Sequence, residues 1–226
     1  MIKLIIFDWD DVFTLGSKEG YIQCYHESLR ELGVHLDAEE EKKRILERWS
    51  EPHQEKFKKL LKERPELIDE ACELYEDKLF GETFISNVKF INGGQNLLNN
   101  LNRKYSLAVA TGANKQILDR VFEKYSVPQV FSKIMYAYEI DDPRLHKPHP
   151  YMLNTIMSEL HFAPQETVFV GDAASDVQAA QAAHVTPIVV LTGHLNTDQA
   201  EKLGVKYIIE DVTKLPQVLD KIASGE

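Results

Sequence analysis

The chain has 226 residues, enough for one large domain or for a domain that carries an insertion, and we expect the second arrangement. Its apolar fraction of 43% and charged fraction of 27% are those of a globular protein, which argues against disordered, fibrous and membrane classes. Lys and Arg number 26 against 36 Asp and Glu, a formal net charge of -10, so we expect no binding to nucleic acid or to an anionic membrane.

The first predicted element is a short buried strand. Leu4-Ile5-Ile6-Phe7 is apolar throughout, and Asp8, Asp10 and Asp11 follow it closely. The apolar run is too short for the core of a signal peptide or for a membrane span. We therefore expect a cytoplasmic protein.

Residues 17–85 are predicted to form a separate all-helical module, because four helical segments and no credible strand occur there. Asp37 followed by Glu40 resembles a capping box before a helix that reaches Trp49. Pro65 suits the first turn of a later helix. A helical insertion directly after a strand that carries candidate site residues is well placed to close over a ligand.

The two cysteines belong to the same helical region. Cys24 and Cys72 lie far apart in helix-patterned stretches. This usage is typical of buried thiols in a reducing compartment, so we interpret both as packing residues.

From Asn92 onward, apolar runs alternate with amphipathic stretches. The predicted strands are 107–110, 167–170, 186–191 and 207–209, and the predicted helices include 115–125 and 150–160. The strands are apolar without polar alternation, which indicates a parallel sheet covered on both faces. The predicted fold is therefore α/β: a three-layer, Rossmann-like core of residues 1–16 and 86–226 with an inserted all-helical cap of residues 17–85.

Polar residues stand where these strands are expected to end. Asp8, Thr111 and Asp172 each follow an apolar run, and ligands of open parallel sheets bind beyond the carboxyl ends of the strands. If these strands are neighbours, each close carboxylate pair costs roughly 4 kcal/mol at an effective dielectric near 20. A divalent metal is the simplest relief, and oxygen ligands without a Cys or His cluster favour Mg²⁺.

The residue types predict phosphoryl chemistry. Strand geometry would hold Asp8 rigidly enough to act as a nucleophile, and Asp10 can give a proton to a leaving oxygen and later take one from water. Thr111 and Gly112 offer a hydroxyl and an unhindered amide to anionic oxygens. Lys147, in a loop stiffened by prolines, adds a positive charge for phosphate. Such a set neutralises a transferring phosphoryl group.

The motifs Asp8-x-Asp10, Thr111, Lys147 and Gly171-Asp172-x-x-x-Asp176 occur in this order over nearly the whole chain. The set resembles the haloacid dehalogenase-like hydrolase superfamily, in its phosphoglycolate phosphatase-like branch with a helical cap. The resemblance implies an aspartyl-phosphate on Asp8, acid-base catalysis by Asp10, and phosphate binding by Thr111 and Lys147.

The resemblance also implies a Mg²⁺ site formed by Asp8, the Asp10 carbonyl and Asp172. Asp176 would either ligate the ion through water or orient Lys147. In one departure, Asp11 stands where the family usually has a glycine whose amide faces phosphate. The Asp11 carboxylate either points into solvent or weakens anion binding.

The expected activity is hydrolysis of a small phosphorylated metabolite by a monomer or homodimer. Asp10 argues against dehalogenase chemistry, which lacks this second carboxylate. A mutase would carry Thr and His at the hinge, where this chain has Gly16 and Gly20. A phosphonatase would need a cap lysine that forms a Schiff base, and the polar surroundings of Lys18 do not favour a neutral amine. A non-catalytic binding module that retains the fold is the remaining alternative.

Overall fold

The computed structural model of the protein describes residues 1–47 and 51–225, which form two compact units. One unit combines Met1–Leu15 with the chain from Phe90 onward, and the other comprises Gly16–Lys89. The second unit is therefore an insertion in the first.

The ends of the insertion lie slightly outside the predicted range, because Gly16 and residues 86–89 belong to the helical unit. Gly16 has a φ of +86°, and a Cβ added to it would lie 2.6 Å from the Asn87 carbonyl oxygen. This close backbone approach brings the first and last turns of the helical unit together. The flanking segments β2 (Thr14–Leu15) and β3 (Lys89–Phe90) pair as a two-stranded sheet.

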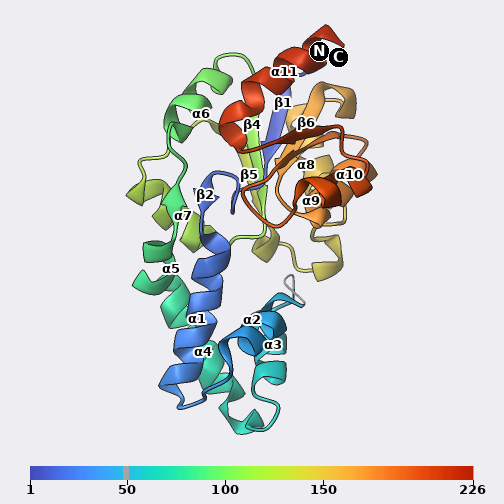
Figure 1. The fold of residues 1–226 in the computed structure, drawn as a ribbon. Helices are drawn as coiled ribbons and strands as arrows, with labels where there is room; N and C mark the ends of the chain where they lie inside the picture. The colour runs from blue at the N-terminus through green and yellow to red at the C-terminus, as the bar shows by residue number, and fades with distance from the viewer. Residues whose placement is uncertain (48–50, 226) are drawn as a thin grey trace. The chain divides into compact units, whose positions relative to one another are not determined.

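A six-stranded parallel sheet forms the centre of the first unit (Figure 1). In spatial order its strands are β5 (Phe131–Tyr136), β4 (Ser106–Thr111), β1 (Leu4–Phe7), β6 (Thr167–Gly171), β7 (Thr186–Val190) and β8 (Tyr207–Ile209). The chain winds outward from β1 through β4 to β5, and then returns to the other side of β1 to form β6. Such a reversal of strand order is where open α/β sheets bind their ligands.

Helices cover both faces of this sheet. One face carries α8 (Tyr151–Leu160), α9 (Ala174–Ala182) and α10 (Thr197–Lys202), and the other carries α6 (Gly94–Asn102), α7 (Lys115–Lys124) and α11 (Leu215–Ser224) (Figure 1). Leu4 and Ile6 of β1 pack with Met152 of α8 in one buried cluster. Ile5 and Phe7, which point to the opposite face, are also fully buried. The predicted three-layer α/β core is confirmed.

The predicted strands and helices after Asn92 are confirmed, but β5 is a strand that the sequence pattern does not predict. Two polar residues, Ser132 and Lys133, interrupt the apolar side chains of Phe131–Tyr136, and most of the strand is only partly buried. The reason is its position at the edge of the sheet, where only β4 pairs with it.

The second unit is helical, as the sequence predicts, although its described residues contain five α-helices rather than four. They are α1 (Ser17–Glu31), α2 (Ala38–Leu46), α3 (His53–Leu60), α4 (Ile68–Phe80) and α5 (Glu82–Asn87). Asp37 caps α2, since its carboxylate accepts hydrogen bonds from the amides of Glu39 and Glu40. Pro65 begins a short 3₁₀ turn that leads into α4.

An aromatic cluster holds the helical unit together. The ring of Tyr25 lies 4.3 Å from that of Tyr75 and 5.1 Å from that of Phe57, measured between centroids. Cys24, which precedes Tyr25 in the sequence, is buried, and Cys72 is partly buried. Both cysteines have free thiols. Tyr75 is buried and belongs to the core of the helical unit. Trp49, the predicted end of the helix that follows Asp37, lies outside the described residues.

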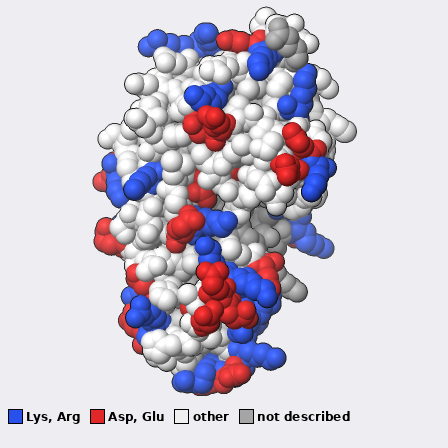
Figure 2. Space-filling model, in the orientation of Figure 1, with Lys and Arg blue, Asp and Glu red and all other residues white. Residues whose placement is uncertain are grey.

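Charged side chains of both signs are interspersed on the face of the protein drawn in Figure 2. Many form ion pairs across short distances, such as Lys78 with Glu31 at 2.6 Å and Lys133 with Glu159 at 2.7 Å. No helix within the described part of the chain has both the length and the apolar character that a bilayer crossing requires.

Candidate active site

The central strands bring three of the predicted residues to one edge of the sheet. Asp8 directly follows β1, Thr111 is the last residue of β4, and Asp172 directly follows β6. β1 lies between the other two strands, with Phe7 opposite both Val109 and Val170. All three residues are buried. Parallel strands in this register place their carboxyl ends side by side, as the sequence pattern requires.

Lys147 lies between two of the carboxylates. Its Nζ is 2.6 Å from Oδ1 of Asp8 and 2.7 Å from Oδ1 of Asp176, and its side chain is only 10% exposed. Burial disfavours the ammonium, but the attraction of Asp176 and Asp8 is stronger, so the pKa of Lys147 is raised. A permanent positive charge is thus held against Asp8.

Asp176 fixes both Lys147 and the loop after β6. Its Oδ1 accepts the Lys147 hydrogen bond, and its Oδ2 accepts hydrogen bonds from the amides of Asp172 and Ala173 at 3.2 and 3.0 Å. A Cβ on Gly171 would lie 2.5 Å from the Cβ of Asp176, so this position needs glycine. Of the two roles left open by the sequence for Asp176, orientation of Lys147 is the one seen in this geometry.

The carboxylates crowd one another. Burial raises the pKa of Asp8 from 3.8 to about 7, with Lys147 opposing the rise and Asp176 and Asp10 adding to it. Burial also raises the pKa of Asp172 well above its usual range, and Asp176 and Asp8 act in the same direction. One ammonium therefore does not balance the negative charge that these residues carry when ionised.

The same residues fit a divalent cation. Carboxylate oxygens of Asp8, Asp172 and Asp176 lie within 4.8 Å of one another, and all three side chains are buried. The donors are oxygens, which is the ligand type that Mg²⁺ prefers. Three carboxylates against one lysine leave an excess of two negative charges, which one divalent ion balances.

The loop after β1 carries Asp10 and is held by aromatic packing. The Trp9 ring stacks on Phe13 with centroids 5.1 Å apart and lies 4.8 Å from the ring of Phe122 in α7. The Thr14 hydroxyl contacts Oδ1 of Asp10 at 3.4 Å. These aromatic contacts and the Thr14 hydroxyl therefore hold the turn that bears Asp10 in place.

Thr111 and Gly112 form the turn after β4. The Thr111 hydroxyl oxygen accepts a hydrogen bond from the Ala113 amide at 3.0 Å. This bond does not use the hydroxyl hydrogen, which remains able to donate to an anion. A Cβ on Gly112 would meet no atom within 4 Å, so its amide is not crowded from that side.

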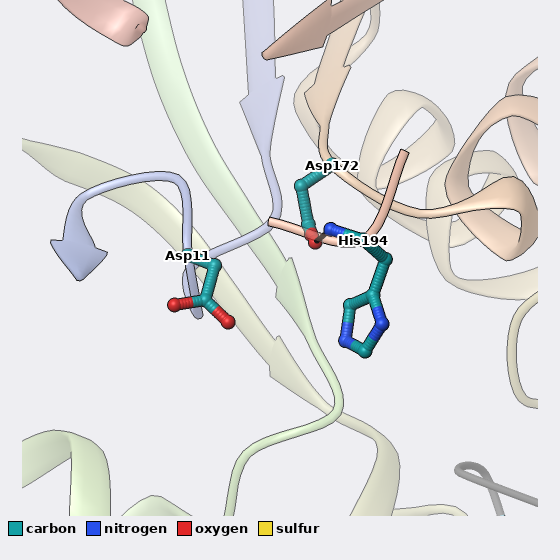
Figure 3. Close-up of side chains that lie close together, drawn as sticks. All are labelled: Asp11, Asp172 and His194. Carbon is teal, nitrogen blue, oxygen red and sulfur yellow. Dashed lines mark hydrogen bonds between the residues drawn. The ribbon is translucent and has the colours of Figure 1, made fainter. Parts of the chain in front are cut away.

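Asp11 does not point into solvent, because the residue is only 4% exposed. Its φ of 55° is in the left-handed region, and its carbonyl oxygen accepts a hydrogen bond from the Thr192 hydroxyl. Figure 3 shows Asp11 beside Asp172 and His194. Burial therefore rules out the solvent-directed alternative for this carboxylate.

Sequence reasoning missed the loop after β7. The amide of His194 donates a hydrogen bond to Oδ2 of Asp172 at 2.9 Å (Figure 3). A Cβ on Gly193 would lie 1.9 Å from the same oxygen, so only glycine fits there. The signal was present, because Thr192, Gly193 and His194 follow a predicted strand just as Asp8 and Asp172 do.

A sequence profile identifies the family. The profile of the haloacid dehalogenase-like hydrolases matches residues 5–190, which include every predicted site residue. The chain belongs to this family. The resemblance that the four motifs predicted is confirmed.

Two curated relatives illustrate the range of this family. The phosphoglycolate phosphatase of Salmonella paratyphi A is 33% identical over 106 residues, which are 47% of this chain and 40% of that protein. The D-glycero-β-D-manno-heptose-1,7-bisphosphate 7-phosphatase of Escherichia coli is 38% identical over 76 residues, 33% of this chain and 39% of that protein. The chain thus spans less than half the length of these relatives.

Solved structures of the family share the fold over almost the whole chain. A haloacid dehalogenase superfamily hydrolase from Geobacter sulfurreducens has a TM-score of 0.73 and 25% identity, and covers 96% of both chains. A protein from Haemophilus somnus described as a predicted phosphoglycolate phosphatase has a TM-score of 0.81 and 16% identity, and covers 96% of this chain and 98% of its own. The second likeness supports the fold alone.

Proposed function

We propose that this protein is a Mg²⁺-dependent phosphatase that hydrolyses a small phosphomonoester through a covalent intermediate on Asp8. The observation that carries the proposal is the position of Lys147, whose ammonium lies 2.6 Å from Asp8 and 2.7 Å from Asp176. This contact joins motifs that are far apart in the sequence around one carboxylate. Family membership and the phosphatase names of the relatives support the same activity.

In the first step, an Asp8 carboxylate oxygen attacks phosphorus and forms an acyl-phosphate bond, while the bond from phosphorus to the leaving oxygen breaks. Asp10 donates a proton to that oxygen, so the product leaves as a neutral alcohol. Lys147, the Thr111 hydroxyl and the amides of residues 11 and 112 stabilise the charge on the transferring group.

In the second step, water attacks the phosphorus of the aspartyl-phosphate. Asp10, now ionised, accepts a proton from this water, and the bond between phosphorus and the Asp8 oxygen breaks. Inorganic phosphate leaves and both carboxyl groups return to their starting states. The reaction consumes one water and needs no other reactant.

Asp8 must be ionised to act as the nucleophile, and burial works against ionisation by raising its pKa to about 7. Asp8, the Asp10 carbonyl and Asp172 would hold Mg²⁺. When bound, the ion supplies positive charge that favours ionised Asp8 and offsets charge on the phosphoryl oxygens. Asp176 serves as a positioning residue for Lys147.

Phosphate release from a chromogenic phosphomonoester, with Mg²⁺ and with a chelator, tests this proposal. We expect Mg²⁺-dependent turnover that Asp8→Asn abolishes and that Asp10→Asn lowers by about 10²- to 10⁴-fold. Asp198→Asn is a matched control, because Asp198 is exposed in the first turn of α10. Turnover that persists without metal or in Asp8→Asn would contradict the mechanism.

The names of the relatives refer to different phosphate compounds. We therefore propose a small phosphomonoester as the substrate class and do not choose one compound. We assign control of substrate access to the helical unit Gly16–Lys89, which is inserted a few residues after the proposed nucleophile. A screen of phosphoglycolate, sugar phosphates and nucleotides, ranked by kcat/KM, identifies the substrate.

The free thiols support a cytoplasmic location.

A further inference from the structure

Asp11, Asp172 and His194 form a second set of metal-ligating side chains beside the proposed Mg²⁺ site. They come from three separate loops, which follow β1, β6 and β7 (Figure 3). One potential ligand atom from each residue lies within 4.8 Å of the other two. Unlike the set of Asp8, Asp172 and Asp176, this set contains an imidazole nitrogen.

The loops hold these residues close together. Asp11 and Asp172 are 4% and 3% exposed, so two carboxylates are buried next to each other. His194 is tied to Asp172 by its amide, and the next residue, Leu195, donates its amide to the Asp172 carbonyl oxygen at 2.9 Å. The Thr192 hydroxyl is bonded to the Asp11 carbonyl oxygen. The backbone therefore limits the volume that the three side chains can search.

We propose that Asp11, Asp172 and His194 bind a divalent transition-metal ion such as Mn²⁺ or Co²⁺, at a site that shares Asp172 with the Mg²⁺ site. Imidazole is a ligand for first-row transition ions, whereas Mg²⁺ prefers oxygen donors alone. Asp11 contributes a carboxylate that is not counted in the charge balance of the Mg²⁺ site, and Asp172 is shared between the two ions. Three protein ligands leave coordination positions for water or a substrate oxygen.

The backbone at position 11 does not require an Asp side chain, so the carboxylate can be removed to test metal binding. Its φ of 55° is a conformation that Asp tolerates and that glycine adopts readily. Glycine is also the usual family residue here, so Asp11→Gly removes the carboxylate without backbone strain. His194→Ala likewise keeps the amide that binds Asp172, because that hydrogen bond uses the backbone.

Mn²⁺ binding followed by electron paramagnetic resonance tests the proposal without measuring activity. We expect Mn²⁺ bound to the wild-type protein to show modulation from a directly coordinated nitrogen. His194→Ala should lose this nitrogen signal, and both His194→Ala and Asp11→Gly should weaken binding of that ion by at least about 10-fold, since even supporting residues around metal sites contribute about this much.

His184→Asn is the matched control, because His184 is exposed and its φ of 57° is one that Asn tolerates. Asp8→Asn separates this proposal from the proposed function, since it should abolish turnover and keep the nitrogen-coupled Mn²⁺. A wild-type spectrum with only oxygen ligands would overturn the proposal even if a variant failed to fold. Unchanged Mn²⁺ affinity in both folded variants would overturn it as well.

Discussion

Replacement of Asp8 by Asn should stabilise the metal-free protein, although it removes the proposed nucleophile. The pKa of Asp8 rises from 3.8 to about 7 because the residue is buried. A group whose pKa is raised by folding favours the folded state at low pH, and this contribution is lost as the pH rises through the folded-state value. Asn resembles the protonated acid and avoids that loss.

The magnitude follows from linkage. A rise of about 3 units at about 1.4 kcal/mol per unit makes ionised Asp8 cost about 4 kcal/mol at pH 8. At pH 5 the folded protein keeps Asp8 protonated, and the cost is only about 2 kcal/mol. The advantage of Asp8→Asn in the free energy of unfolding should therefore grow by about 2 kcal/mol over this range.

Urea unfolding followed by circular dichroism, with a chelator present, measures this difference at each pH. Asp198→Asn serves as the exposed control and should show no growing advantage. Saturating Mg²⁺ should reduce or reverse the advantage, because the ion stabilises the wild-type carboxylate by binding the folded state. A variant that is less stable than the wild type at pH 8 without metal would refute the reasoning.

Three further outcomes test other contacts. Gly193→Ala places a Cβ 1.9 Å from Oδ2 of Asp172 and should lower Mg²⁺ affinity by at least about 10-fold in calorimetric titration, so an unchanged affinity would show that this carboxylate does not bind the ion. Lys147→Met removes the cation that lowers the pKa of Asp8, so the acidic limb of the pH profile of kcat/KM should move to higher pH, and a limb that stays in place would mean that Asp8 does not control it. Phe57→Ala removes a fully buried ring from the core of the helical unit and should cost about 3–5 kcal/mol in thermal unfolding, whereas a loss below about 1 kcal/mol would contradict that packing.

The architecture and the members of the proposed phosphate site could be predicted from sequence because they depend on local pattern. Leu4–Phe7 is buried on both faces and therefore apolar at every position, which identifies a central strand. Asp8, Thr111 and Asp172 directly follow or end such strands, and parallel strands place those ends at one edge. The sequence pattern did not predict β5, because this edge strand is only partly buried and does not form a continuous apolar run.

Contacts between separate loops could be identified only from the tertiary structure. His194 follows a predicted strand, but its approach to Asp172 depends on the neighbouring positions of β6 and β7 and on the lack of a side chain at Gly193. The direction of the Asp11 carboxylate was likewise open until its burial was known. Short-range hydrophobic pattern locates the strands along the chain, whereas their order in the sheet and the meeting of side chains from separate loops are decided only when the whole sheet has assembled.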